Sequence, residues 1–248
     1  MDAMIFAAGL GTRLRPLTND RPKALVEFGG MTILERVARR LIEAGADRIV
    51  INTHHFPERI EELVRERDSF GVDVRLSHER GEPLDTGGGL QRARPLFRGD
   101  RPILLHNCDV VSDFDLRELY ETHQSRDAAP PGGGAIATLA VLPPSPERYL
   151  IFDDEGFCGY APRSGGDDVH ARPLAGEAVH RDFAGIHVVS PELLHTLDGD
   201  GAFSIIFHYM RLAREGQRIG RFEQPGVHWI DVGTHEKLAQ AQRMFGGT

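Results

Sequence analysis

Ala3-Met4-Ile5-Phe6-Ala7-Ala8-Gly9-Leu10-Gly11-Thr12-Arg13, residues 3–13, is the stretch that decides the fold. Its first half is a short, continuously apolar run ended by glycine, which is typical of a buried strand. Similar runs at 48–52, 72–76 and 102–106 alternate with helical patterns over 33–41, 57–64 and 115–124. This alternation predicts an α/β domain with a mostly parallel sheet covered on both faces. Ligands of such sheets bind beyond the carboxyl ends of the strands, where residues 9–13 would lie.

In the second half of the chain, strands and helices no longer alternate regularly. The segment from Asp127 to Gly134 is rich in proline and glycine and predicts a flexible surface loop. After it we expect strands at 135–142, 149–152, 157–161, 183–189 and 219–223, with helices near 191–197, 204–215 and from Thr234. We expect a single domain over 1–248, with a nucleotide-binding half at 1–126 and a sugar-binding half at 135–248.

Composition excludes several classes of protein. The 248 residues carry a formal net charge of -8, so the chain lacks the basic field that nucleic acids and anionic membranes require. Two cysteines, Cys108 and Cys158, without a CxxC spacing favour a reducing, cytoplasmic setting. The apolar runs are too short for a signal peptide or a membrane span. The sequence leaves a monomer and a small homo-oligomer open.

The residues from Gly9 to Pro16 have the chemistry of a phosphate-binding loop. Glycines let backbone N–H groups approach phosphate oxygens, and Arg13 and Arg15 add guanidinium groups. Lys23, one of only two lysines, follows in Arg-Pro-Lys. The loop does not fit a Walker A motif, and Leu14 stands where the dinucleotide fingerprint needs a third glycine. A dinucleotide oxidoreductase is therefore disfavoured, and a simple tight turn is the plainer alternative.

The full string, Gly-X-Gly-Thr-Arg-X-X-Pro-Leu-Thr followed by Arg-Pro-Lys-X-Leu-Val, resembles the signature of the sugar-1-phosphate nucleotidyltransferases. The resemblance implies a Rossmann-like three-layer α/β sandwich around a mostly parallel, mixed sheet, the nucleotide-diphospho-sugar transferase fold. It implies an Mg²⁺-dependent enzyme that joins a nucleoside triphosphate to a sugar 1-phosphate. Arg13 and Lys23 would be catalytic, because their charges would stabilise the reacting phosphates.

Two aspartates match the metal ligands of this family. Asp109, in Asn107-Cys108-Asp109, follows the strand expected at 102–106, and Asp231 lies in Trp-Ile-Asp-Val-Gly-Thr. A carboxylate that faces a triphosphate is repelled unless a divalent cation lies between them. The alternatives are a turn aspartate at 109 and, at the second motif, a helix capped by Thr234.

The resemblance also assigns the substrate contacts. Those expected at the nucleotide are Ala8, Gly9, Gly11, Thr12, Arg13, Glu79, Asp85, Thr86, Gly87, Gly88 and Asn107. Gly185 and Cys108 are expected at the sugar, although Cys108 departs from the glycine usual there. The family's Glu-Lys-Pro motif is missing, which leaves Arg163 or Arg172 as substitutes for its lysine.

Substrate choice rests on two strings, residues 81–89 and Phe183-Ala184-Gly185-Ile186-His187. They resemble members that use UTP and N-acetylmuramate 1-phosphate, from cell-wall sugar recycling. Guanylyl transfer to mannose 1-phosphate, thymidylyl or uridylyl transfer to glucose 1-phosphate, and cytidylyl transfer to phosphocholine stay open. A non-catalytic nucleotide-sugar sensor is the alternative from another class of protein.

Overall fold

The computed structural model describes residues 1–127, 134–145, 149–162 and 166–246. Four parallel strands form the centre of its main sheet, in the order β6-β1-β4-β5. They are β1 (Asp2–Phe6), β4 (Arg48–Thr53), β5 (Asp73–His78) and β6 (Ile103–Asn107). The predicted parallel sheet is confirmed, with strand bounds that differ by one or two residues.

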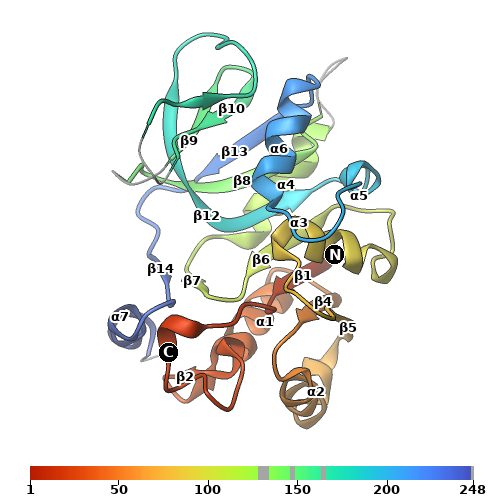
Figure 1. The fold of residues 1–248 in the computed structure, drawn as a ribbon, viewed down its shortest axis with the longest axis vertical. Helices are drawn as coiled ribbons and strands as arrows, with labels where there is room; N and C mark the ends of the chain where they lie inside the picture. Colours follow the sequence, from red (N-terminus) through yellow and green to blue (C-terminus); the bar gives the residue numbers. More distant parts are fainter. Residues whose placement is uncertain (128–133, 146–148, 163–165, 247–248) are drawn as a thin grey trace.

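The second half of the chain extends this sheet in the antiparallel direction. The long strand β12 (Val179–Val189) pairs with β6, and β8 (Ala137–Leu142) pairs with β12. β13 (Ile219–Glu223) runs parallel to β8. The other end of β12 carries β9 (Leu150–Asp153), β10 (Gly156–Tyr160) and β11 (Val169–His170). The sheet is therefore mixed, and Figure 1 shows β9 and β10 far from α1 and α2.

Helices cover both faces of the sheet, and β1 shows why. Ala3 and Ile5 belong to one buried cluster and Met4 to the other, because alternate side chains of a strand point to opposite faces. The first face is covered by α1 (Ile33–Glu43), α2 (Pro57–Glu66), α4 (Leu116–Asp127) and α7 (His235–Phe245). The second is covered by α3 (Asp85–Ala93), α5 (Leu193–Thr196) and α6 (Ile205–Arg214). The three-layer sandwich is confirmed.

Two helix starts that matter for the site are capped by threonine. Thr32 accepts a hydrogen bond from the backbone N–H of Glu35 at the start of α1, at 3.1 Å. Thr234 accepts one from Lys237 at the start of α7, at 3.3 Å. Such caps satisfy donors that a helix leaves unpaired in its first turn. The predicted cap by Thr234 therefore exists.

The sequence did not predict the shortest elements. Two strand pairs lie outside the main sheet: β2 (Glu27–Phe28) with β3 (Met31–Thr32), and β7 (Val110–Ser112) with β14 (Trp229–Asp231). Strands of two or three residues are too short to show a period of two. Four single 3₁₀ turns were missed as well: Thr12–Leu14, Lys23–Leu25, Asp68–Gly71 and Arg94–Leu96.

Two parts of the sequence-based prediction lie outside the described residues. They are positions 128–133 of the expected loop and Arg163. In the part of the chain that the structure describes, every helix is too short or too polar to cross a lipid bilayer.

Three buried histidines make stability depend on pH. Burial lowers the pKa of His187 to about 3, and the pKa of His106 and of His208 to about 4. The unfolded chain takes up these protons near pH 6.5, whereas the folded protein resists them, so stability is full above about pH 6.5 and falls below it.

Between pH 7.5 and 5.0 we expect each histidine to lower the free energy of unfolding by about 2 kcal/mol. Urea unfolding at the two pH values measures this loss. His187 is the best probe, because neither of its ring nitrogens has a hydrogen-bond partner among the described residues. His187→Phe should show a smaller loss than the wild type, and an equal loss in both proteins would contradict the assignment.

Candidate active site

A cavity of about 520 Å³ opens at the carboxyl ends of β1 and β6. This is where a parallel sheet is expected to bind its ligand. Residues from six separate segments line it: Phe6 to Arg13, Lys23 and Ala24, Asn52, then Pro83, Asp85 and Thr86, then Asn107 to Asp109, and finally Gly233. Most of the residues predicted to bind the nucleotide or the metal are thus brought together around one cavity.

The glycine loop, residues Gly9–Arg13, is fixed by close packing against the segment around Lys23. Gly11 has a φ of 61°, and a Cβ at this position would lie 2.8 Å from the Cβ of Lys23. The hydroxyl of Thr18 donates a hydrogen bond to the carbonyl oxygen of Gly11 at 2.9 Å. A Cβ at Gly9, in contrast, would meet nothing within 4 Å. The loop is therefore packed on one side and open at Gly9, which lines the cavity.

Lys23 and Asp109 meet in this cavity. The Nζ of Lys23 lies 2.6 Å from Oδ2 of Asp109, and the side chains are 13% and 31% exposed. The two residues are 86 positions apart and come from a 3₁₀ turn and from the bend after β6. Each charge is held in place by the other, next to the open side of the glycine loop.

The β7–β14 strand pair brings Asp231 next to Asp109, although Asp231 itself does not line the cavity. In this pair Asp231 is opposite Val110, and the backbone N–H of Val232 donates to the carbonyl oxygen of Asp109 at 2.8 Å. Asp231 Oδ1 is buried and has no hydrogen-bond partner among the described residues. A Cβ at Gly233 would lie 2.7 Å from this oxygen and 2.8 Å from Nη2 of Arg13. Arg13 and both predicted metal ligands are thus close neighbours.

The two aspartates suit a magnesium ion that is shared with a substrate. The described residues contain no group of three or more His, Cys, Asp or Glu side chains that could hold a metal by themselves. Mg²⁺ is usually bound by one or two carboxylates together with water and substrate phosphates. A buried carboxylate oxygen without a partner, as at Asp231, is costly unless a cation or donor arrives. The donor set therefore fits Mg²⁺ held jointly with phosphate.

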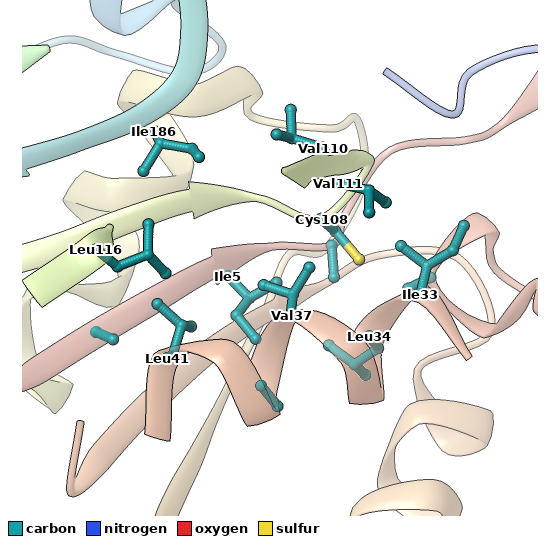
Figure 2. Packing of buried hydrophobic residues seen from close by; sticks show 14 of the residues in the cluster. Ile5, Ile33, Leu34, Val37, Leu41, Cys108, Val110, Val111, Leu116 and Ile186 are labelled. Atoms are coloured by element: carbon teal, nitrogen blue, oxygen red, sulfur yellow. The ribbon is translucent and has the colours of Figure 1, made fainter. Parts of the chain in front are cut away.

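Cys108 lies between Asn107 and Asp109, but its thiol points into the core. Figure 2 shows its sulfur among Ile5, Ile33 and Val37, on the face of the sheet that α1 covers. Burial raises the pKa of this thiol, so it stays neutral. The residue lines the cavity without directing a reactive sulfur into it, so the predicted sugar contact would have to involve its backbone.

The glycines at 87–89 lie within α3, a helix whose bounds the sequence did not predict. A Cβ at Gly87 would lie 2.2 Å from the ring of Phe203, and one at Gly88 would lie 2.5 Å from the carbonyl oxygen of Gly201. The absence of side chains therefore lets residues 201–203 pack directly on the helix. Gly87 and Gly88 do not line the cavity, whereas Asp85 and Thr86 do. Asp85 has a φ of 58°, a strained conformation for a residue with a side chain.

Asn52 lines the cavity and was missed from the sequence. Asn52 lies near the carboxyl end of β4. This strand is the parallel neighbour of β1, so its end lies beside the glycine loop that follows β1. The rule that ligands bind beyond strand ends could have suggested it. Glu79, predicted at the base, is buried and does not line the cavity. Its two carboxylate oxygens accept hydrogen bonds from Asn52 and from the backbone of Leu84.

Of the sugar contacts predicted from the sequence, only part can be placed in the structure. Gly185, with a φ of 75°, abuts Asn107: a Cβ there would lie 2.8 Å from the Asn107 side-chain nitrogen. Arg172 binds Asp153 with contacts of 2.6 and 2.7 Å, so its guanidinium is already used within the fold. The roles of Gly185 and Cys108 at a sugar stay predictions.

Gly233→Ala tests this geometry directly. The added methyl group would meet Asp231 Oδ1 and Arg13 Nη2 at less than 3 Å, so one of the two must move. We expect turnover to fall by at least about tenfold, because misplacing a catalytic group by an ångström is costly. Steady-state kinetics and a thermal melt are the measurements. Wild-type turnover in a folded variant would show that these groups are not needed where they lie.

Comparisons with known proteins identify the family to which the chain belongs. A family model described as nucleotidyl transferase matches residues 2–149, and the chain belongs to this family of enzymes. It is 34% identical to the N-acetylmuramate alpha-1-phosphate uridylyltransferase of Caulobacter vibrioides, over 98% of this chain and 96% of the relative. It is 30% identical to the protein of the same description from Neisseria meningitidis, over 99% of both chains. The crystal structure of HddC from Yersinia pseudotuberculosis complexed with GMP-PN has the same fold, with a TM-score of 0.73, 21% identity and coverage of 98% and 99%.

Proposed function

We propose that this enzyme transfers a uridylyl group from UTP to N-acetylmuramate 1-phosphate and releases pyrophosphate. The observation that carries the proposal is the meeting of Lys23, Asp109 and the open glycine loop in one cavity. The choice of UTP and of N-acetylmuramate 1-phosphate is supported by two relatives that match over nearly the whole chain.

The chemistry needs no general base, because a sugar phosphate is already ionised at neutral pH. An oxygen of the sugar phosphate attacks the α-phosphorus, the bond between the α-phosphorus and the bridging oxygen breaks, and its electron pair leaves with pyrophosphate. Mg²⁺, held by Asp109 and Asp231, would neutralise charge on the phosphates. Arg13 binds the departing β- and γ-phosphates, and the ammonium of Lys23 offsets charge between the attacking oxygen and the α-phosphate. The glycine loop offers backbone N–H groups to the triphosphate.

A substrate matrix tests the proposal. The purified enzyme is given each of UTP, GTP, CTP and dTTP with N-acetylmuramate, mannose and glucose 1-phosphates and with phosphocholine, in the presence of Mg²⁺, and pyrophosphate is measured. We expect UTP with N-acetylmuramate 1-phosphate to give the highest kcat/KM. A higher kcat/KM for another pair would show that the proposed substrates are wrong and would identify that pair instead. If no pair releases pyrophosphate, a non-catalytic nucleotide-sugar sensor is favoured.

A further inference from the structure

Asn52 and Glu79 form a buried hydrogen-bonded bridge beneath the cavity. Asn52 lies near the end of β4 and Glu79 directly follows β5, and they are 2% and 5% exposed. The side-chain amide of Asn52 donates to Oε1 of Glu79 at 2.7 Å. Neither residue belongs to the predicted reaction machinery at the phosphates, so their burial needs another explanation.

Each end of the bridge holds a segment that lines the cavity. The backbone N–H of Ala7, just before the glycine loop, donates to Oδ1 of Asn52 at 2.7 Å. The backbone N–H of Leu84 donates to Oε2 of Glu79 at 2.8 Å. Leu84 lies between Pro83 and Asp85, both of which line the cavity. A continuous path of hydrogen bonds therefore joins the glycine loop to residues 83–86.

The donors and acceptors along this path allow one arrangement. A backbone N–H can only donate, so the side-chain oxygen of Asn52 must face Ala7 and its amide nitrogen must face Glu79. An ionised carboxylate only accepts, which suits both the Asn52 amide and the Leu84 N–H. Gly89 of α3 leaves room for the pair: a Cβ there would lie 2.8 Å from Glu79 Oε1 and 2.9 Å from Asn52 Nδ2. The helix thus packs directly over the bridge.

We propose that Asn52 and Glu79 are positioning residues that set the spacing between the glycine loop and residues 83–86, and thereby the affinity for the nucleoside triphosphate. This inference rests on the proposed function, which places the triphosphate in this cavity. Glu79 acts from beneath the site, through Leu84, because both of its carboxylate oxygens already accept hydrogen bonds from Asn52 and Leu84. The affinity for the nucleoside triphosphate therefore depends on the hydrogen bond between Asn52 and Glu79. Its donor and its acceptor can be exchanged between the two positions by mutation.

Two single variants break the pattern and their combination restores it. In Glu79→Gln, one amide N–H group must face another donor, at either Leu84 or Asn52. In Asn52→Asp, a carboxylate oxygen faces the Glu79 carboxylate. In the double variant, the carboxylate introduced at position 52 accepts from Ala7 and from the amide introduced at position 79, while the oxygen of that amide accepts from Leu84. The double variant therefore satisfies every group again, with the charge moved from one position to the other.

Binding of magnesium-UTP by calorimetry, the KM and kcat for UTP, and the melting temperature are measured for all four proteins. We expect each single variant to raise Kd and KM by about tenfold, as an unpaired buried donor or acceptor predicts, with kcat within about threefold. The double variant should lose much less affinity than the product of the two single losses, because every group of the path is paired again. Should a single variant fail to fold, Leu84→Pro removes the Leu84 donor at a residue whose φ of -85° is close to that of proline, and it should raise Kd in the same way.

Two results would overturn the inference. One is wild-type affinity in both folded single variants, even if their melting temperatures fall, because a purely structural pair would behave in this way. The other is a double variant whose losses are the product of the single losses. If the wild type itself fails to bind magnesium-UTP, the proposed function has failed instead.

Discussion

Asp109→Asn should reduce kcat/KM by at least about a thousandfold, which corresponds to about 4 kcal/mol of lost transition-state stabilisation. Asparagine has the shape of aspartate, but it lacks the charge that would hold Mg²⁺ and that pairs with Lys23 at 2.6 Å. Pyrophosphate release at increasing Mg²⁺ concentrations measures the effect. More metal should not restore the rate, because Asp231 alone would remain as a carboxylate ligand.

Asp113→Asn is the matched control for this variant. Asp113 follows β7 in the same part of the chain, but it is exposed, pairs with His228 at 2.8 Å and does not line the cavity. We expect its turnover to stay within about twofold of the wild type, since exposed ion pairs contribute little. Near-normal turnover of Asp109→Asn, in a protein with the melting temperature of the wild type, would contradict the role proposed for this carboxylate.

Lys23→Met should lower kcat/KM by a factor of about a hundred to a thousand, the usual cost of removing a charge that stabilises a transition state. Methionine keeps the length and apolar character of the chain but leaves Asp109 without its cation. We expect the larger part of the loss in kcat, because the ammonium is most needed when charge moves between the phosphates. Lys23→Arg should not restore the rate, since a planar guanidinium cannot replace a compact charge in a packed site.

Arg21→Met provides the comparison for Lys23. Arg21 is two residues away and carries the same charge, but it is exposed and pairs with Asp20 at 3.1 Å. Pre-steady-state and steady-state kinetics of the two variants separate a local effect from the loss of one positive charge on the surface. Equal losses in both variants would argue against a specific role for Lys23.

The elements with long, regular patterns could be predicted from the sequence. The buried strand at 48–52, a short and mostly apolar run, is β4 as predicted. The helix at 33–41 was evident from its spaced apolar residues and its closing glycine. The convergence of the glycine loop, Lys23, Asp109 and Asp231 followed from the resemblance, whereas spacing alone would have left these residues unconnected.

What could not be predicted depends on contacts between distant segments. The glycines at 87–89 have poor helix propensity, yet they lie in α3, where their missing side chains leave room for residues 201–203 and for the Asn52–Glu79 pair. β7 and β14 are strands only because they pair with each other across more than a hundred residues. The resemblance predicted that Glu79 contacts the nucleotide. In the structure its two carboxylate oxygens accept hydrogen bonds from Asn52 and from the backbone of Leu84, which the sequence could not show.

The pairing of β7 with β14 also has a consequence for the order in which the site is assembled during synthesis of the chain. The glycine loop, Lys23 and Asp109 are all translated within the first half of the protein, and the parallel strands around them can fold early. Asp231 is translated only with β14, more than a hundred residues after Asp109. A growing chain on the ribosome can therefore build most of the cavity while still lacking its second carboxylate. With the role proposed for Asp231, catalysis would begin only after β14 has paired with β7, and a chain that lacks β14 would not consume nucleotide.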